Sequence, residues 1–376
     1  MYDWIIAGAG FTGATVAERI ATQLGQRVLL VDRRSHIGGN AYDHYDAAGV
    51  LIHAYGPHIF HTNSDRVWTY LQQFSDWTPY FHRVRAIIDG REAPIPFNLD
   101  TIEAVFPAGL AAKYIDALLA QYRFGERVPI LKLMERSEPL LRDLGAYVYE
   151  KVFRNYTQKQ WGFGPEELSP AVTARVPILV SRDDRYFQDR YQAMPTRGYT
   201  ALIANMLRHE KISLMLQTSF EDARQAFPKA RVLYTGPIDE YFGCKFGRLP
   251  YRSLDLRWRT LDKEQAQSTP VINYPEEFAF TRITEMKQLT GQVSPKTSLV
   301  AEHPCAYEPG RNEPYYPIPR DETRALYALY EEEARKTAGV IFAGRLGSYQ
   351  YLNMDQAVGA ALAVFEKKIR NDGEGD

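Results

Sequence analysis

The feature that most constrains this chain is a glycine pattern close to its start. The apolar segment Trp4–Ala7 runs directly into Gly8-Ala9-Gly10-Phe11-Thr12-Gly13, and a stretch with helical spacing follows to Ile20. Glycines at this spacing, between a strand and a helix, allow a tight turn, a close approach of backbone to a pyrophosphate, and close packing of helix on strand. A second apolar segment, residues 27–31, ends at Asp32, about 20 residues after the pattern, where an acid can accept ribose hydroxyls. The sequence therefore predicts an α/β unit that binds a dinucleotide.

Composition excludes several other classes of protein. The 376 residues carry 45 Lys and Arg against 46 Asp and Glu, so no overall charge attracts nucleic acid or an anionic membrane. With only Cys244 and Cys305, the chain has neither a disulfide scaffold nor a cysteine-rich metal site, which fits a reducing compartment. The first strand begins almost at Met1, and no apolar run is long enough to span a bilayer. We expect a soluble, cytoplasmic protein without stable membrane insertion.

Periodicity along the chain predicts a nucleotide-binding fold interrupted twice. A hairpin is indicated around Asp89-Gly90, helical spacing dominates residues 101–159, and extended patterns dominate residues 241–317 before a final strand and helix. We assign the parts as follows: residues 1–64, 196–240 and 318–376 to a Rossmann-like domain; residues 101–170 to a helical insertion; and residues 79–97, 171–195 and 241–317 to one antiparallel sheet domain with substrate contacts.

The return of the fold through Gly344-Arg345 and a last helix is typical of large FAD proteins, and the chain resembles one family of them, the bacterial UDP-galactopyranose mutases. The segments that carry the resemblance keep the family's order over nearly the whole chain: Gly8–Gly13, residues 36–40, 56–62, 155–161, 195–199, 281–285, 313–319 and 344–355. Tyr-Thr-x-Lys-Gln-Trp at 156–161 and Arg-Leu-Gly-x-Tyr-x-Tyr-Leu at 345–352 are distinctive of the family, whereas the glycine pattern is not.

The resemblance implies an α/β fold in which a Rossmann-like FAD-binding domain carries an inserted helical domain and an antiparallel sheet domain. It implies a redox-neutral isomerase that interconverts UDP-galactopyranose and UDP-galactofuranose, for galactofuranose biosynthesis and cell-envelope polysaccharide. In the family, N5 of reduced FAD attacks the anomeric carbon and displaces UDP, so the cofactor is the nucleophile. NAD(P)H or a reductase as electron source and a homodimeric state are further expectations, and no nucleic-acid partner is expected.

By resemblance, four residues are catalytic: Arg175, Arg282, His61 and His58. The two arginines would neutralise the diphosphate of the leaving group, since guanidinium offers a planar fork of donors. The substrate contacts are expected from Tyr156, Trp161, Arg175, Tyr186, Asn273, Arg282, Tyr315, Tyr351 and Asn353. Among these, Tyr156, Trp161 and Asn273 match the uridine side, and a loop around residues 162–177 would close over the sugar.

The cofactor contacts are expected from Gly8, Gly10, Phe11, Thr12, Gly13, Asp32, Arg33, Gly39, Asn40, His58, Ile59, Gly236, Arg345, Tyr351 and Met354. Arg345 would stabilise an anionic reduced flavin. His58 and His61 have a spacing that metal ligands can have, but no third ligand signal follows, so we expect no metal. Two departures from the family are visible. Asn353 stands where many members have Asp, and Val152 stands where an aromatic side chain facing uracil is expected.

Three other functions remain open. A flavin oxidoreductase of the amine-oxidase type would share the FAD-binding elements, but it needs an apolar substrate pocket, and the arginines and tyrosines favour an anionic nucleotide sugar. A non-catalytic protein that binds a flavin or a nucleotide sugar is the second. An NAD dehydrogenase is disfavoured, because such enzymes do not need Gly38-Gly39 or the Gly344-Arg345 element. The sequence also leaves open whether an N-acetylated sugar is tolerated.

Overall fold

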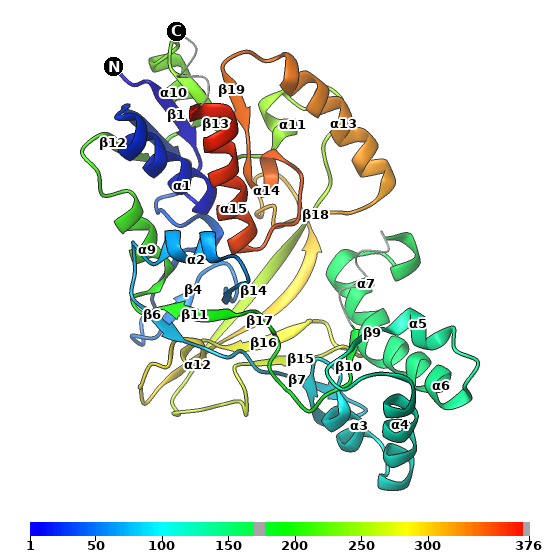
Figure 1. Cartoon of the computed structure of the whole chain (residues 1–376). Coiled ribbons are helices and arrows are strands. Elements are labelled where there is room, and N and C mark those ends of the chain that lie inside the picture. Colours follow the sequence, from blue (N-terminus) through cyan, green and yellow to red (C-terminus); the bar gives the residue numbers. More distant parts are fainter. Residues whose placement is uncertain (169–176, 371–376) are drawn as a thin grey trace.

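The computed structural model describes residues 1–168 and 177–370. Figure 1 shows an α/β part that contains the first strand and the last described helix, a long twisted sheet beneath it, and a helical part at the far end of that sheet. The α/β class and the Rossmann-like unit predicted from sequence are confirmed.

A five-stranded parallel sheet forms the centre of the α/β part. Its order is β12-β2-β1-β13-β19, with bounds Ile212–Leu216, Val28–Asp32, Trp4–Ala7, Arg231–Tyr234 and Val340–Phe342. Alternate residues of β1 point to opposite faces: Trp4 and Ile6 pack with Val16 and Phe365, whereas Ile5 joins the core on the other face. Both faces are therefore buried, as expected of a parallel sheet.

Helices cover both faces of this sheet. Helix α1 (Phe11–Arg19) and helix α15 (Met354–Val364) pack together on one face, each extended by a π-helical turn, and α10 (Phe220–Ala226) covers the other. The remaining helices of this part are α2 (Asp65–Leu71), α9 (Gly198–Met206), α11 (Ile238–Tyr241), α13 (Asp321–Lys336) and α14 (Gly344–Gly347). Both α1 and α15 begin at the carboxyl edge of the parallel sheet, where ligands of such folds bind.

The second sheet has seven strands in the order β18-β14-β17-β16-β15-β7-β8, with bounds Tyr316–Pro317, Tyr251–Leu261, Thr297–Ala306, Arg282–Glu285, Val271–Asn273, Val84–Ile88 and Arg91–Ile95. The predicted hairpin around Asp89-Gly90 is β7 and β8, and it joins this sheet as expected. One pair differs from the prediction, because β15 and β7 run parallel. They come from separate hairpins, so no tight turn fixes their relative direction.

Residues 177–195 do not join this sheet, contrary to the prediction. Strand β10 (Pro177–Leu179) pairs with β9 (Arg127–Pro129) beside the helical part, and β11 (Tyr191–Pro195) pairs with β5 (Phe60–Thr62) and β6 (Trp77–Pro79). Such short apolar runs carry no signal for which strands they will pair with, and the pairing here is set by contacts far away in sequence. A further small hairpin consists of β3 (Asp43–Tyr45) and β4 (Leu51–His53).

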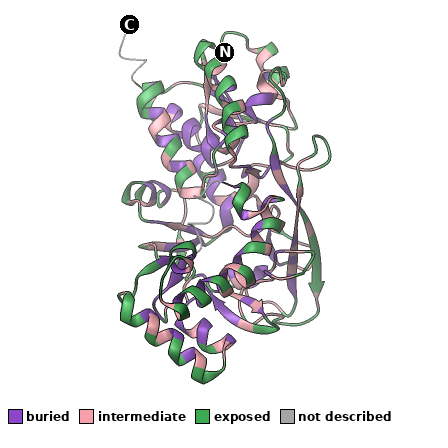
Figure 2. Cartoon of the chain, turned by 90° about the vertical axis from the view of Figure 1, so that its right-hand side faces the viewer, coloured by how far each residue is buried: buried purple, intermediate pink, exposed green. Residues whose placement is uncertain are grey.

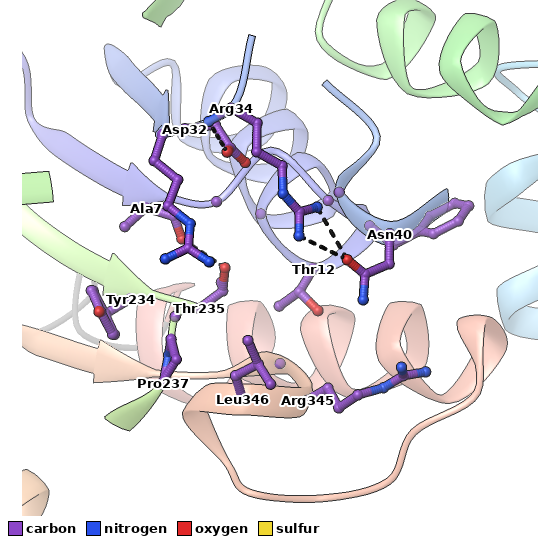
Figure 3. A pocket seen from close by; sticks show the side chains of 18 of the residues that line it. Ala7, Thr12, Asp32, Arg34, Asn40, Tyr234, Thr235, Pro237, Arg345 and Leu346 are labelled. Carbon is purple, nitrogen blue, oxygen red and sulfur yellow. Dashed lines mark hydrogen bonds between the residues drawn. The ribbon is translucent and has the colours of Figure 1, made fainter. Parts of the chain in front are cut away.

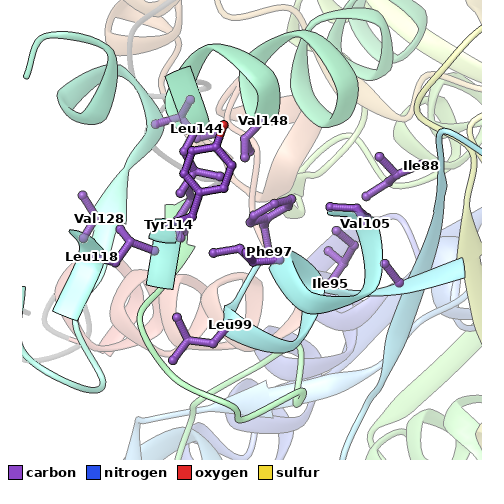
Figure 4. Packing of buried hydrophobic residues seen from close by; sticks show 14 of the residues in the cluster. Ile88, Ile95, Phe97, Leu99, Val105, Tyr114, Leu118, Val128, Leu144 and Val148 are labelled. Carbon is purple, nitrogen blue, oxygen red and sulfur yellow. The ribbon is translucent and has the colours of Figure 1, made fainter. Parts of the chain in front are cut away.

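The helical insertion contains α3 (Leu99–Val105), α4 (Ala108–Gln121), α5 (Ile130–Met134), α6 (Pro139–Val148) and α7 (Asn155–Trp161), and α12 (Met286–Thr290) lies outside it. Helix α3 starts at 99 because Asn98 and Thr101 exchange side-chain-to-backbone hydrogen bonds of 2.9 and 3.0 Å at its N-terminus. The core of the helical insertion includes Phe97, Leu118 and Leu144, all fully buried (Figure 4). This core continues into the seven-stranded sheet through Val84 and Ala86 of β7 and Val271 of β15, and Figure 2 shows buried residues in both helices and strands of the molecule. Lys159 of α7 donates to the carbonyls of Glu276 and Phe280, which holds α7 beside the segment between β15 and β16.

Candidate active site

The glycine pattern forms a turn in which two stretches of backbone nearly touch. Gly8 has a φ of +108°, and a Cβ at Gly13 would lie 1.9 Å from the carbonyl oxygen of Gly8. A Cβ at Gly39 would lie 2.9 Å from the Cα of Gly10, and the Gly38 N–H donates to the Ala9 carbonyl. Only glycine fits these positions, and the start of α1 is thereby left open to a pyrophosphate.

A cavity of about 340 Å³ lies against this turn (Figure 3). Most of the predicted cofactor residues line it: Gly8, Gly10, Phe11, Thr12, Gly13, Asp32, Arg33, Gly39, Asn40, His58, Gly236, Arg345 and Met354. Ile59 and Tyr351 line a neighbouring cavity instead. The glycine cradle, the helix N-terminus and an acid at the end of β2 together fit the pyrophosphate and ribose of a dinucleotide.

Asp32 has a second role that the sequence did not indicate. One carboxylate oxygen accepts a hydrogen bond from the Ala9 N–H and the other from the Arg34 N–H, both at 2.9 Å. The carboxylate therefore braces the glycine turn itself. Each oxygen keeps acceptor capacity, so a ribose hydroxyl can still bind.

Arg34, which the sequence analysis did not single out, also lines this cavity, and its side chain is only 16% exposed. Its guanidinium donates to Asn40 and, at 2.6 Å, to Glu313, and it lies over the ring of Tyr55. Burial works against ionisation of Glu313, but Arg34 and Arg33 outweigh it and lower the pKa of that carboxyl. This ion-paired cluster ties the end of β2 to the segment before β18.

The second cavity, of about 530 Å³, adjoins the first and extends towards the seven-stranded sheet. Five residues line both cavities: Asn40, His58, Arg345, Asn353 and Met354. Of the predicted substrate and catalytic residues, this cavity gathers His58, His61, Tyr186, Asn273, Arg282, Tyr315, Tyr351 and Asn353. Arg175 lies outside the described residues.

His58 stands where the two cavities meet. Its Nδ1 lies 2.8 Å from the Gly56 carbonyl oxygen, so Nδ1 carries the proton and Nε2 is an acceptor. Burial, followed by the neighbouring charges of His53, Arg345 and Arg282, lowers the pKa of His58 to about 3. The backbone N–H of His58 donates to Nδ1 of the buried His53 at 3.0 Å, which fixes this loop.

Arg282 supplies positive charge to the second cavity. It lies directly opposite Glu302 across β16 and β17, and its Nε donates to Glu302 Oε1 at 2.6 Å. Burial opposes the charge of Arg282, but Glu302 outweighs that effect and the pKa rises well above its usual value. Glu302 is 1% exposed, and its Oε2 has no hydrogen-bond partner among the described residues. The sequence analysis missed Glu302, because only strand pairing brings it opposite Arg282.

Tyrosines line the wall around Arg282. Burial raises the pKa values of Tyr186, Tyr315 and Tyr316, so their hydroxyls remain protonated and can donate to an anion. Tyr316 was not predicted as a contact. Trp161 does not line the cavity: it is 8% exposed and its ring contacts Tyr316 and Tyr351 edge-on from behind.

Two other positions expected on the uridine side, Tyr156 and Val152, do not line the second cavity. Tyr156 is half-buried on α7 and does not line the cavity, although it lies near enough to Arg282 and Tyr186 to interact with them electrostatically. Val152 packs against the core of the helical insertion.

In the described parts of the chain, no group of three or more His, Cys, Asp or Glu side chains is arranged to hold a metal ion. Nor is any described helix both long and apolar enough to cross a membrane.

Comparisons with known proteins decide the family. A family model described as "GLF: UDP-galactopyranose mutase" matches residues 151–351, and one for an NAD(P)-binding Rossmann-like domain matches residues 6–74. A probable UDP-galactopyranose mutase from Klebsiella pneumoniae is 38% identical, covering 96% of this chain and 94% of the relative. This chain belongs to the UDP-galactopyranose mutase family. It is accordingly an enzyme, an isomerase.

Other relatives refine this assignment. A dTDP-fucopyranose mutase from Escherichia coli is 32% identical over 98% of this chain and 99% of its own length. Among solved structures, a reduced UDP-galactopyranose mutase matches with a TM-score of 0.70 at 16% identity, covering 97% of this chain and 93% of the other. A putrescine oxidase matches with a TM-score of 0.58 at 12% identity, covering 98% of this chain and 99% of the other. At such identities the structural matches establish a shared fold.

Proposed function

We propose that this enzyme interconverts UDP-galactopyranose and UDP-galactofuranose without net oxidation or reduction. The observation that carries the proposal is the pair of adjoining cavities, one built on glycine backbone and the other on arginine and tyrosine side chains. FAD would occupy the first cavity, and the nucleotide sugar the second. His58 and Arg345, which line both cavities, would then stand where the flavin ring meets the sugar.

The cofactor, when bound in its reduced form, would supply N5 as the nucleophile that forms a covalent bond to the anomeric carbon. The role of the protein's own residues is to hold and orient the flavin ring. The N-terminus of α15, at Asn353 and Met354, and the guanidinium of Arg345 lie at the shared wall, where a positive potential favours an anionic reduced ring. Arg345 itself is held by hydrogen bonds to the carbonyls of Tyr315 and Leu352.

UDP can leave only if the negative charge of its diphosphate is neutralised by cationic or hydrogen-bonding side chains. Arg282 is suited to this, because Glu302 holds its Nε while the rest of the fork is free of carboxylates among the described residues. Arg175 is proposed as its partner on the basis of the family resemblance. The hydroxyls of Tyr186, Tyr315 and Tyr351 would donate to the same phosphates, Tyr156, Trp161 and Asn273 would serve the uridine, and Asn353 would contact the sugar without a charge.

Physiological context is likewise proposed. Family membership supports a cytoplasmic, homodimeric enzyme that makes galactofuranose for cell-envelope polysaccharide, with NAD(P)H or a reductase as electron source.

Two alternatives have observations in their favour. The 32% identity to a dTDP-fucopyranose mutase, over 98% of this chain and 99% of that relative, makes dTDP-fucopyranose the competing substrate. An amine oxidase is supported by the shared fold of putrescine oxidase and by 29% identity to (S)-6-hydroxynicotine oxidase, but that identity covers only 26% of this chain. A cavity that holds Arg282 and several tyrosines suits an anionic ligand better than an amine.

The test is to incubate the FAD-loaded protein with UDP-galactofuranose, once with the flavin oxidised and once after reduction by dithionite, and to separate the sugars by chromatography. Conversion to UDP-galactopyranose in the reduced sample alone, without net flavin oxidation, is the expected result. A parallel incubation with dTDP-fucofuranose ranks the two substrates by kcat/KM. Flavin binding without conversion of either sugar would contradict the proposal and favour a binding protein or an oxidase.

A further inference from the structure

A carboxylate and an imidazole form a pair at the edge of the second cavity. His61 lies on β5 and lines that cavity, and its Nδ1 is 2.9 Å from Oδ2 of Asp189, just before β11. The other oxygen of Asp189 accepts a hydrogen bond from the Asn63 side chain at 2.8 Å. Both members are mostly buried, with side chains 16% and 23% exposed. The carboxylate is thus held in place on one side and faces the imidazole on the other.

This arrangement fixes which ring nitrogen can meet a ligand. Nδ1 faces a carboxylate acceptor, so Nδ1 carries a proton, and Nε2 of His61 has no hydrogen-bond partner among the described residues. The ring of Phe187 stacks on the imidazole, with centroids 3.6 Å apart and planes 14° apart, which restricts rotation of the ring. A histidine held by a carboxylate in this way has one nitrogen committed to structure and one free for proton transfer.

The chemistry of the proposed reaction calls for such a group. Changing a pyranose to a furanose breaks the bond between C1 and O5 and forms one between C1 and O4. O5 gains a proton and O4 loses one, so a single group that lends a proton and takes one back satisfies the balance with no net electron transfer. His58 and His82 also line the cavity, but burial lowers the pKa of each to about 3, so neither holds an extra proton near neutral pH.

Resting on the proposed function, we infer that His61 exchanges protons with O5 and O4 of the sugar through Nε2, and that Asp189 is the positioning residue that sets its tautomer. Asp189 is not among the residues that line the cavity, and its contact with the imidazole is at Nδ1. A carboxylate in this position stabilises the imidazolium, the form that lends the Nε2 proton to O5 and is restored when O4 gives up its proton.

The experiment uses the FAD-loaded, reduced enzyme and UDP-galactofuranose as substrate. Asp189→Asn keeps the shape and removes the charge, and we expect kcat to fall about 10- to 100-fold with little change in KM. Asp189→Glu should restore part of kcat, and His61→Gln should lower kcat at least about 100-fold. The matched control is Asp65→Asn, because Asp65 pairs with the neighbouring Arg190 at an exposed site outside the cavity. Its kcat should match that of the unchanged enzyme.

A readout independent of turnover accompanies these rates. In protein labelled with ¹⁵N-histidine, the His61 resonances should show a protonated Nδ1, and Asp189→Asn should shift the population towards the Nε2–H form. If the unchanged enzyme converts the sugar while His61→Gln keeps its kcat within about twofold, the inference is wrong and the proposed function stands. If the His61 tautomer is the same in Asp189→Asn, the positioning role is wrong. Absence of conversion by the unchanged enzyme would overturn the proposed function, and the inference with it.

Discussion

The two cavities of this enzyme are built in opposite ways. The first is shaped by backbone: glycines at 8, 10, 13 and 39 bring two turns within contact distance, and side chains that would fill the space are missing. The second is shaped by side chains from strands and loops scattered between residues 40 and 356. A backbone site is specified by local sequence and is sensitive to added atoms. A side-chain site depends on the tertiary fold and is sensitive to lost charges and hydrogen bonds.

The largest expected effect comes from removing the charge of the second cavity. Arg282→Ala leaves the carboxylate of Glu302 buried without a partner and removes the cation proposed for the diphosphate. Breaking a buried pair in this way costs about 3–5 kcal/mol, and we expect kcat/KM to fall about 1,000-fold or more. Flavin content, measured by absorbance after gel filtration, should be unchanged. Loss of flavin from this variant would contradict the proposal that the flavin site and the substrate site are built from separate sets of residues.

The converse substitution adds one atom to the first cavity. In Gly13→Ala the new Cβ would lie 1.9 Å from the Gly8 carbonyl oxygen, so the turn must shift, at a cost of about 3 kcal/mol. We expect loss of bound FAD and a lower thermal midpoint. Gly109→Ala is the control, since Gly109 lies within α4 with open space around it, and Ala should stabilise that helix by about 0.5–1 kcal/mol. Retained flavin in Gly13→Ala would refute the backbone-cradle argument.

Low pH should destabilise the folded protein through His53, which accepts a hydrogen bond from the backbone of His58 where the two cavities meet. Burial lowers the pKa of His53 from 6.5 to about 4, so the unfolded chain binds more protons between these pH values than the folded one. The free energy of unfolding should therefore fall as pH drops from 6.5 towards 4, by about 1.4 kcal/mol per pH unit for this group, and stay level above 6.5. His53→Gln, which keeps an acceptor for the His58 N–H, should flatten a plot of urea-denaturation midpoint against pH. An unchanged slope would assign the acid sensitivity to other groups.

The smallest expected effect is at the rim of the first cavity. Glu313 accepts from Arg33 and Arg34 but is 30% exposed, so Glu313→Gln should weaken FAD binding by no more than about 1 kcal/mol. The loss should shrink in high salt, as measured by flavin titration at two ionic strengths. A loss as large as that of Gly13→Ala would mean that side chains, not backbone, dominate this cavity as well.

Sequence reasoning succeeded where structure is local. The strand, glycine turn, helix and terminal acid at residues 4–32 are all present. It failed where pairing is long-range, since β10 and β11 (177–179 and 191–195) left the predicted sheet for other partners. In the site, Arg282 was found by resemblance to a family. Its partner Glu302 and the partner of His61, Asp189, had no motif to reveal them.

The sequence by itself determined the backbone-built cavity, because glycine turns, helix starts and strand periodicity are decided by residues a few positions apart. Only the tertiary structure decided the second cavity. Cross-strand register set Arg282 opposite Glu302, and the pairing of β5 with β11 set His61 near Asp189, at separations of 20 and 128 residues. Such side-chain pairs contribute only when they are buried and correctly placed, and both conditions arise only once distant segments have packed together.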